Sequence, residues 1–165
     1  MYIEYIERLI DEASKSIEER EYNTAKDLMN QGLYEEPDYA KLHNNLGWLY
    51  QYCIKDKKQA ELHLSYAIKF DPKFEASYIN LADLYLEHKE YVQLREVMQK
   101  VLDQDGSNKA ICYENIGKAY EGTCEFSKAI KNYKMAMYET IDSYDADELK
   151  QAIKRCKYKR IKKLF

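Results

Sequence analysis

The feature that most constrains this chain is a pattern of apolar and small residues that returns every 34 or 35 positions. Its best-preserved copy runs from Leu42 to Pro72, LHNNLGWLYQYCIKDKKQAELHLSYAIKFDP. In that copy Gly47 lies in the first half, and Ala60 and Ala67 lie in the second half. A small residue at a fixed place in each of two helical halves, repeated with this period, predicts a solenoid of helical hairpins.

Three tandem segments repeat the first half of the pattern: HNNLGWLY, YINLADLY and YENIGKAY, which begin at residues 43, 78 and 113. They resemble the tetratricopeptide repeat (TPR) family, whose pattern is aromatic, two spacers, Leu, Gly, two spacers, Tyr, then Ala, three spacers, aromatic and a closing Pro. The resemblance covers about residues 3–141. It is least complete in the first copy, where Glu12 and Ser16 replace the expected Leu and Tyr.

The resemblance implies an all-α fold, a right-handed superhelical solenoid of about four antiparallel helical hairpins plus a C-terminal capping helix. We place the TPR array at residues 1–143, with repeats at about 6–39, 40–74, 75–109 and 110–143, and the basic capping helix at 144–165. Proline lacks an N–H group and disfavours helix in the residue before it, so Pro37 and Pro72 mark boundaries between repeats. The family shares a scaffold and little else, so the fold alone does not define a function.

Two local details follow from the spacing within the repeats. Asn23 is a plausible N-cap for the second helix. Tyr50 and Ala60 are ten residues apart, one more than the matching positions of the next repeat. We therefore expect the extra residue in the turn within the hairpin, at about residues 54–57.

The last predicted helix begins near Asp145, because Asp145 and Glu148 have the spacing of a capping box. Its apolar stripe is Leu149, Ile153, Cys156, Ile161 and Phe165. Such a helix would cover the uncovered apolar end of the array. Residues 150–163 hold eight Lys or Arg and no acid, while the rest of the chain carries a charge of about −11, which indicates a basic tail on an acidic scaffold.

In the family that this chain resembles, the first helix of each hairpin lines a concave groove. If the face that holds Gly47 is buried, a step of 100° per residue places another set of residues on the opposite face. From these positions we predict the peptide-binding groove: Lys41, Asn45, Trp48, Tyr52, Asn80, Asp83, Asn115 and Lys118.

Asparagines at positions 45, 80 and 115 form a ladder with 35-residue spacing. An amide donates and accepts, so stacked asparagines can bond successive peptide groups of an extended ligand. The alternative is that they only bond neighbouring helices. Trp48 is the only tryptophan, and truncating such a residue in an interface often costs about 2 kcal/mol or more. Its alternative role is partial burial between adjacent hairpins.

The charge of the predicted groove favours a neutral or basic peptide. The same face of the first helix in all four hairpins comprises sixteen positions, four per hairpin. Together these positions hold five acidic and two basic residues. Ala76 and Ile111 stand where a family member that clamps the acidic carboxyl terminus of a heat-shock chaperone would need Lys. The sequence therefore argues against that mode of binding.

We find no sequence pattern for catalysis, a cofactor or a metal. There is no Gly-rich phosphate loop, HExxH, GxSxG or paired metal-ligand motif. His43 fits an aromatic packing site, and His63 and His88 fit partly exposed helical positions. The four cysteines lie far apart without a CxxC pair, which predicts reduced thiols rather than a zinc site.

The N-terminal segment MYIEYIERLIDE has four acids and no apolar block, and no apolar stretch approaches the roughly 18 residues of a membrane span. We therefore expect a cytoplasmic, non-catalytic protein–protein interaction scaffold that binds a peptide or partner segment in its groove. One alternative is a small chaperone for a secreted or assembling client. Another is contact between the basic tail and nucleic acid or membrane, which the acidic body opposes. The tail could instead lie on the acidic body of its own or another copy, and the sequence leaves the oligomeric state open.

Overall fold

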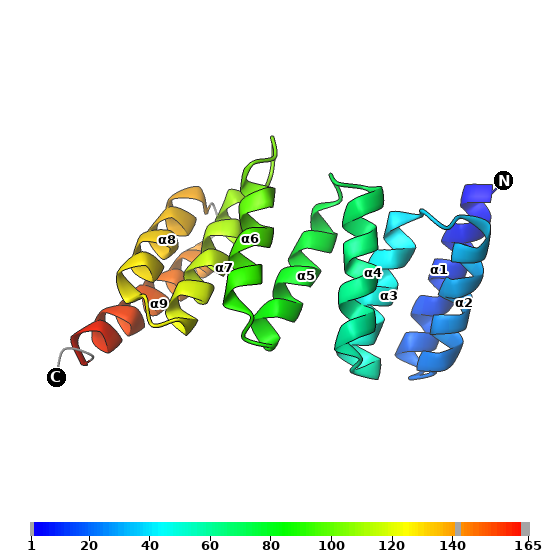
Figure 1. The fold of residues 1–165 in the computed structure, drawn as a ribbon, viewed down its shortest axis with the longest axis horizontal. Helices are drawn as coiled ribbons and strands as arrows, with labels where there is room; N and C mark the ends of the chain where they lie inside the picture. The colour runs from blue at the N-terminus through cyan, green and yellow to red at the C-terminus, as the bar shows by residue number, and fades with distance from the viewer. Residues whose placement is uncertain (1, 141–142, 163–165) are drawn as a thin grey trace. The chain divides into compact units, whose positions relative to one another are not determined.

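The computed structural model describes residues 2–140 and 143–162, with side chains for 4–140 and 146–162. All regular structure in these residues is helical (Figure 1). The elements are α1 (Tyr2–Glu18), α2 (Tyr22–Glu35), α3 (Ala40–Leu49), a π-helical turn (Tyr50–Ile54), α4 (Lys57–Phe70), α5 (Glu75–Glu87), α6 (Tyr91–Leu102), α7 (Lys109–Gly122), α8 (Phe126–Glu139) and α9 (Ser143–Lys162). The predicted all-α class of antiparallel helical hairpins is confirmed.

The chain forms two compact units, Met1–Leu84 and Tyr85–Phe165. In the first unit, helices α1 to α4 contact one another in chain order. Side chains spaced three or four residues apart on α1, α2 and α3 meet in one apolar core, as the periodicity of the sequence predicts. The buried members of this core are Ile6, Ile10, Ala13, Ala25, Met29, Leu42, Leu46 and Leu49.

The α3–α4 hairpin depends on a small residue at position 47. A Cβ atom built on Gly47 would lie 2.5 Å from the Cγ atom of Leu64 and 3.2 Å from the carbonyl oxygen of Ala60. Both Ala60 and Leu64 are fully buried. The absence of a side chain at position 47 therefore allows α3 and α4 to pack at short range.

The second unit is built on α6 to α9, which also contact one another in chain order. Tyr133 of α8 is fully buried and packs where Gly117 of α7 leaves room, since a Cβ atom at 117 would lie 2.7 Å from its ring. Leu149, Ile153 and Cys156 of α9 join the same core. This part of the predicted apolar stripe of the last helix is confirmed.

The polar side of α9 is tied to α7 through one carboxylate. Arg155 donates from Nε and Nη2 to the two oxygens of Glu121, at 2.7 and 2.8 Å. Lys159 and Tyr133 add hydrogen bonds of 2.9 and 3.0 Å. These donors, Arg155 first, lower the pKa of Glu121 to about 2. The carboxylate therefore stays charged and holds the end helix in place.

Each hairpin turn contains one residue in the left-handed backbone conformation. These residues are Arg20, Lys55, Lys89 and Cys124, with φ between 59° and 66°. The next residue is acidic in each case and caps the second helix: Glu21, Asp56, Glu90 and Glu125. In three turns the N–H group of this acid donates to the carbonyl five residues earlier, which is the Schellman arrangement.

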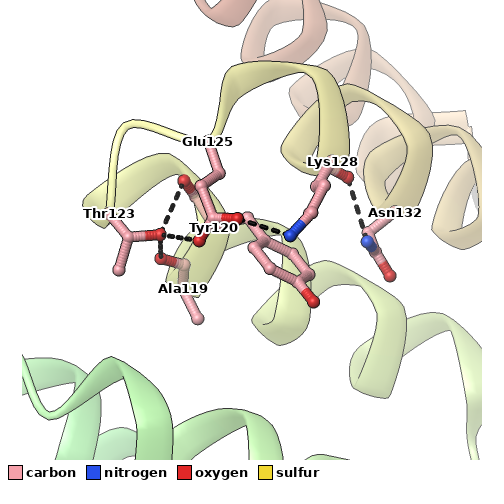
Figure 2. Close-up of polar contacts among 6 residues, drawn as sticks. All are labelled: Ala119, Tyr120, Thr123, Glu125, Lys128 and Asn132. Atoms are coloured by element: carbon pink, nitrogen blue, oxygen red, sulfur yellow. Dashed lines mark hydrogen bonds and ion pairs between the residues drawn. The ribbon is translucent and has the colours of Figure 1, made fainter.

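Figure 2 shows the polar side of one such turn, between α7 and α8. The Thr123 hydroxyl lies 3.3 Å from the carbonyl oxygens of Ala119 and Tyr120. The Lys128 ammonium donates to the Glu125 carboxylate at 2.6 Å and lies 5.2 Å from the centre of the Tyr120 ring. Local contacts thus reinforce the turn that the backbone forms.

The prediction for the extra residue of the second repeat was wrong. Lys55 follows Tyr50 by five residues, whereas the other left-handed residues follow the matching position by four. From Lys55 to Ala60 the spacing is five, as in the other hairpins. The extra residue is therefore inside the first helix. It is taken up by the π-helical turn, in which the Lys55 N–H group donates to the Tyr50 carbonyl five residues back.

The predicted N-cap of the second helix was also wrong. Helix α2 begins at Tyr22 and its N-cap is Glu21, so Asn23 is inside the helix. The left-handed turn at Arg20 sets this start, because Glu21 closes the turn and opens the next helix. Helix α9 begins at Ser143, two residues before the predicted start near Asp145, and the side chain on which the proposed capping box depends lies outside the described residues.

The predicted apolar stripe of the last helix does not continue to its end. Ile161 is 56% exposed, and the side chains of Asp145 and Phe165 lie outside the described residues. The stripe therefore packs only as far as Cys156, one turn beyond Ile153. Beyond that point α9 presents basic and apolar side chains to solvent.

Candidate functional site

Four predicted groove residues lie on one side of α3 and the π-helical turn. Lys41, Trp48 and Tyr52 are exposed and Asn45 is half-buried. His43, Leu46 and Gly47 on the opposite side are buried. The 3.6-residue period of a helix produces this division, since residues three and four apart share a face.

Trp48 and Asn45 line a cleft that also involves the preceding hairpin. Its remaining lining residues are Ser14, Ile17 and Glu18 of α1 and Met29 of α2. The cleft has a volume of about 390 Å³. Apolar side chains form part of its wall, and hydroxyl, amide and carboxylate groups form the rest, a mixture that is typical of ligand sites.

The two aromatic residues of this surface lie together. The ring centroids of Trp48 and Tyr52 are 5.4 Å apart and the ring planes are tilted by 44°. Trp48 is 36% exposed, so the indole is anchored against the protein and still offers part of its surface. An anchored aromatic side chain loses little conformational entropy when it binds a partner.

Ion pairing reduces the charge that the sequence indicates for this face. The Lys41 ammonium lies 2.5 Å from Oε2 of Glu7, and the Tyr39 hydroxyl donates to Oε1 at 2.6 Å. The bond from Lys41 and then that from Tyr39 lower the pKa of Glu7, and the same carboxylate raises the pKa of Tyr39 to about 12. Glu18 makes no ion pair with any described residue, so it supplies unbalanced negative charge in the cleft.

The predicted asparagine ladder has a more local role at position 80. Nδ2 of Asn80 donates to Oδ1 of Asn44 at 2.8 Å, and Asn44 in turn approaches Oδ1 of Asn45 at 3.5 Å. Asn80 thus bonds the neighbouring helix, which is the alternative that the sequence left open. Asn115 belongs to the second unit and is 5% exposed, and its Oδ1 atom has no hydrogen bond within the described residues.

The other two predicted groove residues are not among the residues that line the cleft. Asp83 is half-buried near the end of the first unit. Lys118 lies in the second unit and pairs with Glu114 of its own helix at 2.7 Å. Glu114 and Lys118 line a smaller cleft of about 260 Å³, together with Tyr133 and residues of α9.

A pair of histidines was missed in the sequence, because the two residues are 20 positions apart. Nδ1 of His43 lies 3.0 Å from Nδ1 of His63, and Nε2 of His43 lies 2.9 Å from the Pro37 carbonyl oxygen. A carbonyl only accepts, so Nε2 of His43 carries its proton and Nδ1 accepts from His63. Burial lowers the pKa of both rings, that of His63 to about 4, and Tyr50 stacks on His63.

Residues 4–140 and 146–162 contain no metal-binding cluster, no membrane-spanning helix and no paired cysteines. No three His, Cys, Asp or Glu side chains in that part lie close enough to hold a metal ion. No helix in it is long and apolar enough to cross a bilayer. The four cysteines are free thiols, with Cys112 and Cys156 buried, Cys53 half-buried and Cys124 exposed.

The fold and the cleft together define a class: an α-helical repeat fold of TPR-like hairpins, with a mixed apolar and polar cleft beside an exposed aromatic pair. Solved structures agree with this class. A crystal structure of MamA has a TM-score of 0.69 at 18% identity, covering 98% of this chain and 94% of that one. Residues 41 to the end of MamA from Desulfovibrio magneticus RS-1 give 0.69 at 13% identity, covering 96% of each chain. PilW, a widely conserved type IV pilus biogenesis factor, gives 0.71 at 15% identity, covering 92% of this chain and 77% of that one.

No model of a known protein family matches the sequence, and neither does any curated protein. Identities between 13% and 18% establish the fold alone. The function must therefore be argued from the surface that the fold presents.

Proposed function

We propose that this chain is a member of the TPR family and serves as a non-catalytic protein-interaction module. Its ligand would be a neutral or basic segment of another protein, bound at the cleft beside Trp48. The observation that carries the proposal is the cleft itself. The helical period predicted that Asn45 and Trp48 belong to a binding groove, and both line this cleft together with Ser14 and Glu18 of the preceding hairpin.

The cleft offers each kind of contact that a peptide segment needs. Ile17, Met29 and the Trp48 indole can bury one apolar or long aliphatic side chain. The Asn45 amide still has its Nδ2 donor, which makes no hydrogen bond within the described residues, so it can bind a peptide carbonyl. The Glu18 carboxylate favours a Lys or Arg nearby, and an aromatic face also attracts such a cation.

The test begins with selection of a displayed peptide library on the wild-type chain, with counter-selection on Trp48→Ala. Selected peptides are then titrated while the emission of Trp48 is followed, because a chain with one tryptophan reports on this cleft alone. We expect Trp48→Ala to weaken binding about 30-fold, measured by calorimetry, since about 2 kcal/mol is typical for an aromatic anchor. We expect a small change in melting temperature, because part of the indole is already in solvent.

Tyr34→Ala is the matched control, since Tyr34 is a strongly exposed aromatic residue on α2 that does not line the cleft. It should leave binding unchanged. If Trp48→Ala instead lowers the melting temperature steeply and leaves peptide affinity intact, Trp48 is a core residue and the proposal fails.

A second candidate is a small chaperone for an assembling client, which the similarity to the biogenesis factor PilW favours. It predicts suppression of aggregation of an unfolded client rather than binding of a short peptide. Binding of nucleic acid or membrane by the tail is less favoured, because the rest of the chain carries a charge of about −11, which would repel a polyanion. Such binding would weaken steeply between about 50 and 200 mM salt.

A further inference from the structure

The outer face of α9 is unusual for a helix that closes an array. Leu149, Ile153 and Cys156 are buried on its inner face. On the outer face Tyr158 is 68% exposed and Ile161 is 56% exposed. A helix whose only role is to cover the core needs a polar outer surface, so two apolar side chains here point to a second contact.

The same half of the helix carries positive charge that no residue in the described part of the chain neutralises. Lys150, Arg155 and Lys159 are bonded to Asp147 or Glu121. The other basic residues of α9 are exposed and make no ion pair with any described residue: Lys154, Lys157, Arg160 and Lys162. By helical period Lys154, Lys157 and Lys162 share the outer side with Tyr158 and Ile161, whereas Arg160 follows Cys156 by four residues on the inner side.

The cleft of the first unit has the complementary properties. The first unit holds 16 acidic and 10 basic residues, and the second holds 13 acidic and 16 basic residues. Glu18 lines the cleft and makes no ion pair with any described residue, and Asp11 is exposed two turns earlier on the same helix face. Trp48 is exposed and Ile17 is half-buried, so both offer apolar surface to an aromatic side chain. Opposite charges that surround matching apolar surfaces favour association.

We propose that the outer face of α9 from a second copy of this chain docks at the Trp48 cleft, with Tyr158 against the indole and Lys154 and Lys157 near Glu18. This inference rests on the proposed function, because it assigns an occupant to the same cleft. A second copy is the occupant that the charges favour, because the outer face of α9 carries the cations and the exposed aromatic side chain that complement Glu18 and Trp48.

Contact between α9 and the cleft joins two different surfaces, which is a heterologous interface. Each copy that donates its α9 keeps an open cleft, and each copy that accepts one keeps a free α9. The chain should therefore form dimers and then longer assemblies as its concentration rises, with affinity that falls with salt because exposed charges contribute.

The first experiment measures the wild-type chain by sedimentation velocity and by Trp48 emission over a dilution series, at about 50 and 300 mM salt. We expect larger species at high concentration and low salt, with a blue shift of the emission in parallel. A chain that stays monomeric at every concentration overturns the inference. So does a blue-shifted emission that is independent of concentration, because its own tail would then cover the cleft.

The second experiment uses two variants that are each defective at one surface. Trp48→Ala lacks the cleft anchor, and the double variant Lys154→Glu with Lys157→Glu lacks the tail charge. Each alone should associate at least 30-fold more weakly than wild type. Mixed together they should restore a 1:1 complex, and the emission should shift, because the only tryptophan in the mixture belongs to the intact cleft.

The matched control reverses two exposed lysines on α8, Lys131→Glu with Lys134→Glu, which should leave association unchanged. If the mixture of the two variants forms no complex, the head-to-tail arrangement is wrong. If the wild type does not self-associate while selected peptides still require Trp48, the inference fails and the proposed function stands. If neither depends on Trp48, both fail.

Discussion

The bond network around Glu121 makes a sharp prediction about how the last helix is held. Glu121→Gln keeps the shape of the side chain and removes its charge. Four donated hydrogen bonds reach the carboxylate in the folded protein, two of them from Arg155, and the carboxylate side chain is only 11% exposed. The variant should therefore weaken the attachment of α9 to α7.

The magnitude follows from the pKa of this carboxyl group. A change from 4.5 to about 2 corresponds to about 3 kcal/mol when solvent does not screen the charges. Arg155 and Lys159 are about half exposed, so water can solvate their charges when the carboxylate is removed. This solvation offsets part of the lost stabilisation. We therefore expect Glu121→Gln to lower the free energy of unfolding by about 2 kcal/mol at pH 7.

The assay is urea unfolding followed by circular dichroism, together with hydrogen exchange along α9. Because folding lowers the pKa of Glu121, the stabilisation is complete above about pH 4.5 and is lost as the pH falls through about 2. The difference between wild type and Glu121→Gln should therefore shrink below pH 4.5. Glu125→Gln is the control, since Glu125 pairs with Lys128 at the surface and should change the midpoint far less.

Equal unfolding midpoints for wild type and Glu121→Gln at pH 7 would refute this reasoning. They would mean that the apolar contacts of Leu149, Ile153 and Cys156 alone hold α9. A loss in Glu121→Gln that is the same at pH 7 and near pH 2 would also contradict it, because the charge would then not be its cause.

Three further predictions test the hairpins. Lys89→Gly should raise the free energy of unfolding by about 0.5–1 kcal/mol in urea, because glycine adopts a φ of 59° without a steric penalty, whereas Glu96→Gly inside α6 should lower it by about 1 kcal/mol. Gly47→Ala should lower the melting temperature at a cost of about 1–3 kcal/mol, since the new Cβ atom would meet Leu64; an unchanged melting temperature would show that α3 and α4 can separate freely. Folding lowers the pKa values of His43 and His63, so their contribution to stability should be complete above about pH 6.5 and fall toward pH 4. His63→Phe should flatten this pH dependence of the melting temperature. If the variant and the wild type have the same pH profile, the histidine pair is not the cause of the dependence.

Much of the fold could be predicted because each helix face repeats its chemistry at a fixed period. The close packing of Gly47 against the helix that holds Ala60, and the place of Leu149, Ile153 and Cys156 in the core, follow from spacing and residue size, whereas the contact of Gly47 with Leu64 emerged only from the structure. The start of α2 could not be predicted in this way, since the left-handed turn at Arg20 overrides the capping preference of Asn23. The acid that follows the left-handed residue in every turn is a sequence signal that would have located these starts.

The candidate site could be predicted only in part. The helical period assigned Trp48 and Asn45 to the accessible face, but not the apolar wall formed by Met29. Residues such as Met29 also serve the core, and periodicity alone cannot separate the two uses. The bond from Asn80 to Asn44 and the contact between His43 and His63 join different helices, so they depend on packing distances that a single sequence does not specify.

The π-helical turn at Tyr50–Ile54 also bears on how such repeats diverge. An insertion that widens a single helical turn leaves the spacing from the left-handed residue to the second helix unchanged, so the array can take up the extra residue within one repeat. The lengthened repeat is the one that contains the lone tryptophan, and Tyr52 of the widened turn packs against that indole. Evolution thus has a way to vary a recognition surface in one repeat while the register of its neighbours is inherited intact.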